Sequence, residues 1–122
     1  MVNRSQWIKQ KRRTKLEDTK PERQWDDFAE WAGIESSKAQ KVGEFRPDRE
    51  TQGIYVWIDG PYHWSQRKRH NDDWAVQQVF CLTGKRSLRI DSPLMEPKYW
   101  PYVKQKMEEF LASNEPWKRL YS

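Results

Sequence analysis

The feature that most constrains the fold is an unbroken run of apolar and aromatic residues, Ile54-Tyr55-Val56-Trp57-Ile58, followed at once by Asp59 and Gly60. A short run rich in β-branched and aromatic side chains is typical of a strand that is buried on both faces. A preceding extended segment closes with Pro47 and Asp48, and His63 follows the glycine turn. Two carboxylates and an imidazole are therefore expected at neighbouring strand ends.

Helices and strands are expected to alternate around this run. Thr19 and Glu22 form a capping-box pattern at the start of the first helix, and glycines follow the first and second helices as stops. Apolar spacing predicts helices at about 20–32, from Asn71 or Asp72 to Thr83, and at about 97–112. Strands are predicted at 40–45, 54–58 and 87–91, with a polar, basic loop over 64–71 and a tail from Ser113. This order favours a small α/β fold with a partly parallel sheet covered by helices.

Composition indicates a modest, ring-rich core. Hydrophobic residues make up 35% of the chain, and eight Trp, five Tyr and four Phe supply much of the apolar area. We expect Trp25, Trp31, Trp57 and Trp74 in the core. Trp7 and Trp64 are the candidates for exposed rings.

The positive charge is concentrated at the N-terminus. Residues 1–24 hold eight basic and three acidic residues, whereas the remainder is balanced. A basic block of this kind usually meets a polyanion such as nucleic acid, although a solvated tail is the plain alternative. We expect residues 1–18 to form a flexible arm and residues 19–122 to form a single domain.

The sequence also bounds the compartment. Cys81 is the only cysteine, so no disulfide within the chain is expected. No apolar run approaches the ~20 residues of a membrane span, and the charges of the N-terminus are not followed by the apolar core of a secretory signal. We therefore expect a cytoplasmic protein, and its compactness is typical of phage or mobile-element proteins.

Four residues form the candidate catalytic constellation: Asp48, Asp59, His63 and Glu22. Oxygen ligands of this kind suit Mg²⁺ or Mn²⁺, and a metal can neutralise the charge that develops in phosphodiester cleavage. His63 could act as a general base. Each residue also has an ordinary structural interpretation: a strand-ending turn for Asp48, a turn for Asp59-Gly60, a helix cap for Glu22 and a loop histidine for His63.

These segments resemble the PD-(D/E)XK nuclease superfamily, in the branch of the very-short-patch-repair endonucleases. The matching segments run in order over about residues 19–112: Pro21-Glu22-Arg23, Arg46-Pro47-Asp48, Val56 to His63, Asn71-Asp72-Asp73, Thr83-Gly84 and Leu88-Arg89-Ile90. The resemblance implies a restriction-endonuclease-like fold and hydrolysis of DNA.

The resemblance also implies roles for individual residues. Asp48 would be the primary metal ligand, and Asp59 and His63 would complete the site. Glu22 would be an accessory acid, Asp72 or Asp73 a support, and Arg89 a contact near the site. Many members carry a glutamate where this chain has Trp57, and the repair-type enzymes use a backbone carbonyl instead, which here would be that of Ile58.

The expected partner is DNA. The residues predicted to contact it are Arg12, Arg13, Trp64, Arg67, Lys68, Arg69 and Arg89. Basic side chains would neutralise phosphates, and an exposed ring could stack on bases. The leading hypothesis is a metal-dependent DNA endonuclease or nickase. The alternative is a catalytically degenerate nucleic-acid-binding or assembly module, including a subunit of a larger particle, and the sequence leaves a homodimer open.

Overall fold

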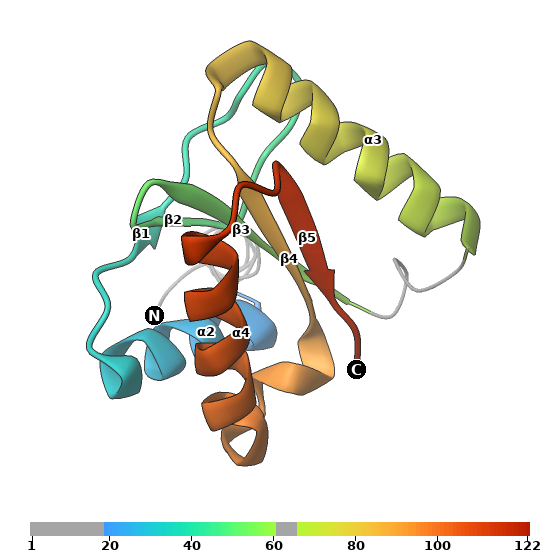
Figure 1. The fold of residues 1–122 in the computed structure, drawn as a ribbon. Helices are drawn as coiled ribbons and strands as arrows, with labels where there is room; N and C mark the ends of the chain where they lie inside the picture. The colour runs from blue at the N-terminus through green and yellow to red at the C-terminus, as the bar shows by residue number, and fades with distance from the viewer. Residues whose placement is uncertain (1–18, 61–65) are drawn as a thin grey trace, which may run out of the picture.

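The computed structural model describes residues 19–60 and 66–122. Within these two ranges, five strands form one mixed sheet in the order β1-β2-β3-β4-β5, flanked by three helices (Figure 1). The elements are α2 (Lys20–Ala32), β1 (Ser37–Lys38), β2 (Arg49–Thr51), β3 (Ile54–Asp59), α3 (Gln66–Thr83), β4 (Ser87–Asp91), 3₁₀ turns η2 (Ser92–Met95) and η3 (Pro97–Tyr99), α4 (Trp100–Ala112) and β5 (Trp117–Leu120). This architecture confirms the expected α/β fold.

The pairing of β3 sets the geometry of the sheet. It lies antiparallel to β2 and parallel to β4, and β4 is in turn parallel to β5. In this register Asp59 is the partner of Asp91, at the carboxyl ends of adjacent parallel strands. Acidic residues therefore lie next to one another at the carboxyl ends of the parallel strands.

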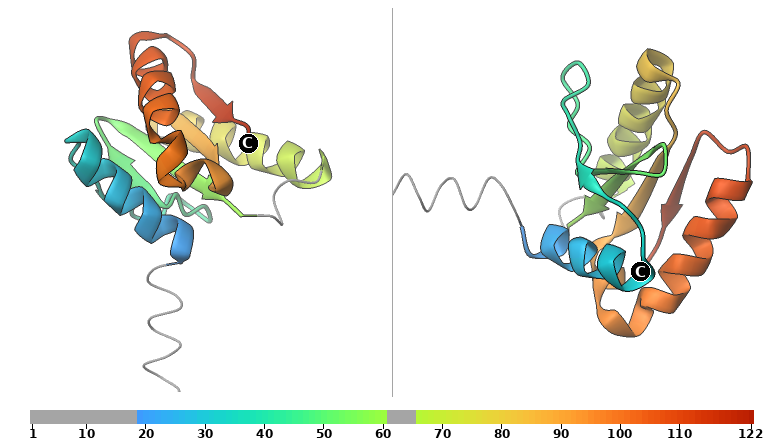
Figure 2. Two further views of the ribbon diagram at one scale, coloured as in Figure 1. Left: turned by 90° about the horizontal axis from the view of Figure 1, so that it is seen from below. Right: turned by 90° about the vertical axis from the view of Figure 1, so that its left-hand side faces the viewer.

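The two faces of the sheet carry different cores. Helices α2 and α4 cover one face and α3 covers the other (Figure 2). The larger core includes Trp25 and Phe28 of α2, Val56 of β3 and Phe110 of α4. The smaller core joins Tyr55, Trp57, Val76 and Val79. Because successive side chains of a strand point to opposite faces, β3 serves both cores, as the unbroken apolar run predicted.

The first helix confirms its sequence signals. Thr19 Oγ1 accepts a hydrogen bond from the Glu22 amide at 3.4 Å, and Gly33 ends the helix at φ 70°. The predicted return bond of the capping box is wrong, because the Glu22 carboxylate accepts from Arg49 instead. None of the helices in the two described ranges is both long and apolar enough to cross a bilayer.

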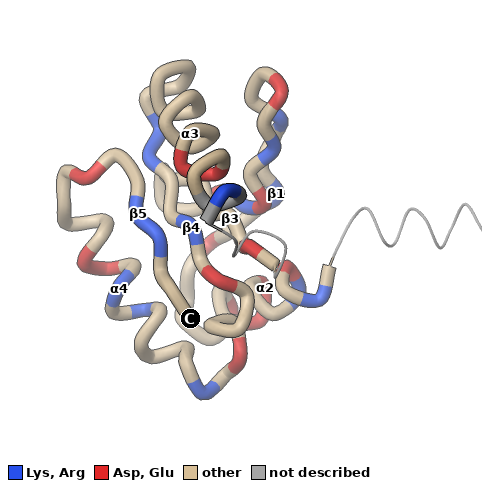
Figure 3. Tube along the Cα trace, turned by 90° about the vertical axis from the view of Figure 1, so that its right-hand side faces the viewer, with Lys and Arg blue, Asp and Glu red and all other residues tan. Residues whose placement is uncertain are grey.

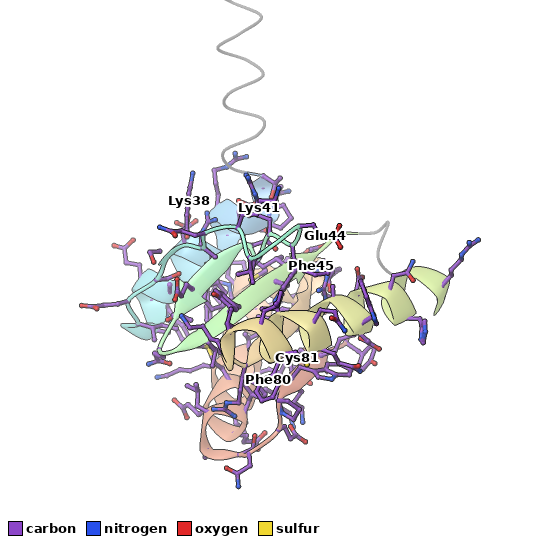
Figure 4. All side chains as sticks on the ribbon, turned by 90° about the horizontal axis from the view of Figure 1, so that it is seen from above. Lys38, Lys41, Glu44, Phe45, Phe80 and Cys81 are labelled. Carbon is purple, nitrogen blue, oxygen red and sulfur yellow. The ribbon has the colours of Figure 1, made fainter. Side chains whose placement is uncertain are left out.

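The predicted strand at 40–45 is wrong. Val42 and Phe45 exchange main-chain hydrogen bonds of 2.8 and 2.9 Å across a tight turn, with Gly43 at φ 59°. The turn folds over the face of α3, where Phe45 packs edge-on against Trp74 with ring centroids 5.7 Å apart. Figure 4 shows Phe45 beside this helix, which also carries Phe80 and Cys81.

Two other boundaries differ from expectation. Helix α3 begins at Gln66, so the predicted loop is helical from that residue and Asn71 and Asp72 lie inside the helix. Glutamine, arginine and lysine are good helix formers. A run of these residues can therefore be helical although its polarity is also typical of a loop. No strand was predicted in the tail from Ser113, yet the tail adds β5 to the sheet.

Two of the four tryptophans predicted to lie in the core are buried, and two are exposed. Trp25 and Trp57 are buried, as expected. Trp31 and Trp74 were expected in the core but are 50% and 51% exposed. Each ring packs against another ring, Trp31 against Trp100 and Trp74 against Phe45. Trp7 and Trp64 lie outside the described residues.

Candidate active site

Asp48 lies immediately before β2, beside the end of β3. Its amide donates to the Val56 carbonyl at 3.0 Å, and its Oδ2 accepts from the Ile58 amide at 2.7 Å. Strand β2 begins at Arg49, so no described strand pairs with the end of β3 on that side, and the Asp48 carboxylate takes that place. The other carboxylate oxygen, Oδ1, has no hydrogen-bond partner in the part of the chain that the structure describes.

The surroundings of Asp48 disfavour an uncompensated negative charge. Burial raises the pKa of Asp48 to about 6, and the nearby carboxylates of Glu22 and Asp59 also raise it. The Ile58 amide and the Arg89 guanidinium act in the opposite direction. Such a site favours a bound proton or a bound cation.

Arg49 joins helix α2 to the strand that follows Asp48. Its guanidinium is buried and donates to both carboxylate oxygens of Asp26, at 2.9 and 3.0 Å. Its Nη1 also donates to Glu22 Oε2 at 3.2 Å and to the Asp48 main-chain carbonyl at 2.9 Å. The start of α2 is thereby fixed against the edge that carries Asp48.

Asp59 is held by two arginines. Arg89 donates to it through both Nε and Nη2, with the Nε bond to Oδ2 at 2.9 Å. Arg119 Nη1 donates to the same Oδ2 at 2.8 Å. All three side chains are buried, and the Arg89 guanidinium also lies 4.7 Å from the centre of the Trp57 ring. Asp59 is therefore the centre of an ion-pair network between neighbouring strands.

Three further carboxylates surround these arginines. Asp91 lies 3.5 Å from Arg119, and Asp72 and Asp73 of α3 approach the same guanidinium at 3.7 and 3.6 Å. Figure 3 shows the acidic segment of α3 next to the basic segments of β4 and β5. Asp72 and Asp73 were expected at a helix start, but they lie inside α3 and face arginines of the sheet.

The structure brings some predicted site residues together and leaves others undescribed. Asp48, Ile58, Asp59 and Glu22 gather at the end of β3. Arg67 is exposed near the start of α3, and Lys68 and Arg69 follow it in the helix. His63, Trp64, Arg12 and Arg13 lie outside the described residues.

The roles of Arg49 and Arg119 were not predicted from the sequence. Arg49 directly follows the Pro-Asp pair, so its position was a usable signal. Arg119 had no local signal, because its partner Asp59 is 60 positions away and the strand that carries it was not predicted. Within the described ranges no group of three or more His, Cys, Asp or Glu side chains is placed to hold a metal ion.

Comparison with known proteins reveals a similarity of fold. No family model matches the sequence, and no curated protein matches it. The solved structure of the homing endonuclease I-Bth0305I catalytic domain superimposes with a TM-score of 0.58. The match has 18% sequence identity and covers 78% of this chain and 96% of that one. The mixed sheet with helices on both faces is thus a fold shared with an endonuclease catalytic domain.

Proposed function

We propose that this chain is a metal-dependent DNA endonuclease or nickase of the PD-(D/E)XK type, with its catalytic centre at Asp48. The observation that supports this proposal is the hydrogen bonding of the two Asp48 carboxylate oxygens. One oxygen is fixed by the Ile58 amide, and the other has no hydrogen-bond partner among the described residues, beside two more acids. The fold shared with an endonuclease catalytic domain gives this arrangement a functional context.

The donor set at this edge fits a hard divalent cation. Mg²⁺ is usually bound through one or two carboxylates and keeps several waters, so a cluster of three side chains is not required. Asp48 and the Ile58 carbonyl would hold it. Because the N–H and C=O of one strand residue point to the same side, the Ile58 carbonyl lies on the edge that its amide shares with Asp48. When bound, Mg²⁺ or Mn²⁺ supplies charge neutralisation and activation of water.

The remaining residues would position and balance this centre. Arg89 and Arg119 keep Asp59 fixed at the end of β3, and Glu22 adds a second negative charge facing Asp48. His63 is the proposed proton acceptor for the attacking water, on the strength of its place after the Asp-Gly turn.

DNA would be bound by two groups of basic residues. Arg67, Lys68 and Arg69 begin α3, the helix that follows β3, and Arg12 and Arg13 belong to the basic N-terminal segment. These side chains would neutralise phosphates. Trp64 would stack on a base. The Arg89 guanidinium is engaged with Asp59, so its contribution would be positive charge near the site rather than an outer contact.

The deciding experiment measures nicking of supercoiled plasmid with Mg²⁺ or Mn²⁺. We expect cleavage by the wild type and none by Asp48→Ala, because the variant loses the carboxylate that would bind the metal. Circular dichroism and thermal unfolding of the variant serve as the control for folding. If the wild type leaves supercoiled, linear and single-stranded DNA uncut with either metal, the nuclease proposal fails.

The second candidate is a nucleic-acid-binding or assembly module that kept the fold without cleavage. It is favoured by Trp57, which stands where many members of the superfamily carry an acid. The ring is buried, and its Nε1 donates to Ser87 Oγ at 3.0 Å, so this residue belongs to the core. This candidate predicts salt-sensitive DNA binding that needs no metal and is unchanged in Asp48→Ala.

A further inference from the structure

Arg49 of β2 contacts helix α2 and also the main chain of Asp48. Its Nε and Nη2 form a two-pronged bond to the Asp26 carboxylate, which is enough to anchor α2 on the sheet. Among the described residues its third nitrogen, Nη1, donates to the Glu22 carboxylate and to the main-chain carbonyl of Asp48. One nitrogen atom therefore links the two acidic residues at the edge of the sheet.

From this geometry we infer that Arg49 is a positioning residue, which sets the place of Glu22 relative to Asp48 at the proposed metal centre. The inference rests on the proposed function and extends it to a residue that touches neither metal nor DNA. Arg49 holds the carbonyl of Asp48 from one side while the Asp48 carboxylate reaches the Ile58 amide on the other. Both the main-chain carbonyl and the carboxylate of Asp48 are thus held by hydrogen bonds.

The positive charge of Arg49 also affects the acidic residues around Asp48. Glu22, Asp26 and Asp48 are three acids near one edge, and Arg49 pairs with the first two. Arg49 is buried, so its guanidinium remains close to these carboxylates with little screening by solvent. The Arg49 guanidinium therefore offsets part of the repulsion between the Glu22 and Asp48 carboxylates, which lie close to one another.

A matched set of variants separates positioning from anchoring. Arg49→Lys keeps the positive charge but cannot reproduce the fork and the two Nη1 contacts together. Glu22→Gln removes only the charge on one side of the link. Asp26→Asn is the control, because it weakens the anchor and leaves both Nη1 acceptors in place. The variants are compared in the full chain by Mn²⁺ calorimetry and by thermal unfolding.

We expect Arg49→Lys and Asp26→Asn both to lower the unfolding temperature. Only Arg49→Lys and Glu22→Gln should weaken Mn²⁺ binding, by about 10- to 100-fold, which is the usual effect of losing a residue that orients a metal ligand. If Arg49→Lys binds Mn²⁺ like the wild type, or if Asp26→Asn loses as much affinity, Arg49 is an anchor only and the inference is wrong.

A second measurement needs no metal. Hydrogen exchange of the Ile58 amide reports the placement of Asp48, because this amide donates to the Asp48 carboxylate. We expect exchange at Ile58 to rise about tenfold in Arg49→Lys and to stay unchanged in Asp26→Asn. This result with a wild type that binds no Mn²⁺ would uphold the positioning by Arg49 and overturn the proposed metal centre. Equal exchange in all variants would overturn the positioning itself.

Discussion

Asp48 and Asp59 lie at the same end of the sheet, yet their surroundings differ sharply. Asp59 is buried and accepts hydrogen bonds from Arg89 of β4 and Arg119 of β5. Asp48 accepts one described hydrogen bond, from a main-chain amide, and carries a pKa raised to about 6. One carboxylate is thus compensated by guanidinium groups, and the other is left in a site that disfavours its charge.

The difference bears on the roles that we propose for these two carboxylates. A buried carboxylate with two arginines ties the strands together, and removing it would leave cations without partners. A carboxylate kept ionised beside other acids lowers stability, and sites of that kind occur where a ligand is to be bound. This contrast is why we propose Asp48, rather than Asp59, as the metal ligand, and why we expect Asp59 to stabilise the fold.

The largest effect is expected from Asp59→Asn. Loss of this charge leaves Arg89 and Arg119 buried with less compensation, so the free energy of unfolding should fall by about 3–5 kcal/mol. Urea denaturation measures the change. Asp73→Asn is the control, because its carboxylate is partly exposed and 3.6 Å from Arg119, and it should cost no more than about 1 kcal/mol. Similar losses in both variants would contradict the central place of Asp59.

A smaller effect concerns the pH dependence of metal binding. Because the pKa of Asp48 is raised to about 6, a proton competes with the cation for this carboxylate at mildly acidic pH. Mn²⁺ affinity should rise about tenfold per pH unit below pH 6 and level off above it. Calorimetry between pH 5 and pH 8 measures this slope. A flat profile would show that Asp48 is not the ligand that sets affinity.

The smallest effect is a gain in stability in Asp48→Asn. The folded-state pKa of Asp48 lies above its ordinary value, so the folded protein binds this proton more tightly than the unfolded chain. Its stabilising effect is complete below about pH 4 and is lost as pH rises through 6. Asparagine can still accept from the Ile58 amide but does not ionise.

Asp48→Asn should accordingly be more stable than the wild type by about 1 kcal/mol at pH 8, a value reduced for the partial exposure of the site. Near pH 4 the two proteins should unfold at similar urea concentrations. A variant that is less stable at pH 8 would mean that the carboxylate is better compensated than this structure shows.

The parts of the fold that sequence predicted are those with local signals. The apolar run of β3 and the caps of α2 fix their own conformation, because propensity, capping and burial agree there. Strand β5 has no such signal, since it is specified by pairing with β4 and by the bond from Arg119 to a distant carboxylate. Long-range pairing of this kind cannot be inferred from neighbouring residues.

The site was predictable to a similar degree and for a similar reason. Asp48 and Asp59 follow apolar segments, so their positions at strand ends were evident from the sequence. Their different chemistry was not, because it depends on which arginines are buried against them. Arg49 would ordinarily be expected on the surface, and it is buried because Asp26 and Glu22 of α2 accept its hydrogen bonds.

The place of Arg119 on the last strand has a consequence for synthesis. A nascent chain that has emerged from the ribosome only as far as β4 can neutralise Asp59 with Arg89 alone, and it leaves the edge of β4 without its neighbour. Domains tend to fold as units once their sequence is complete. Stable folding of this domain is therefore expected to await translation of its final strand, and a premature stop before residue 117 would yield a product prone to degradation.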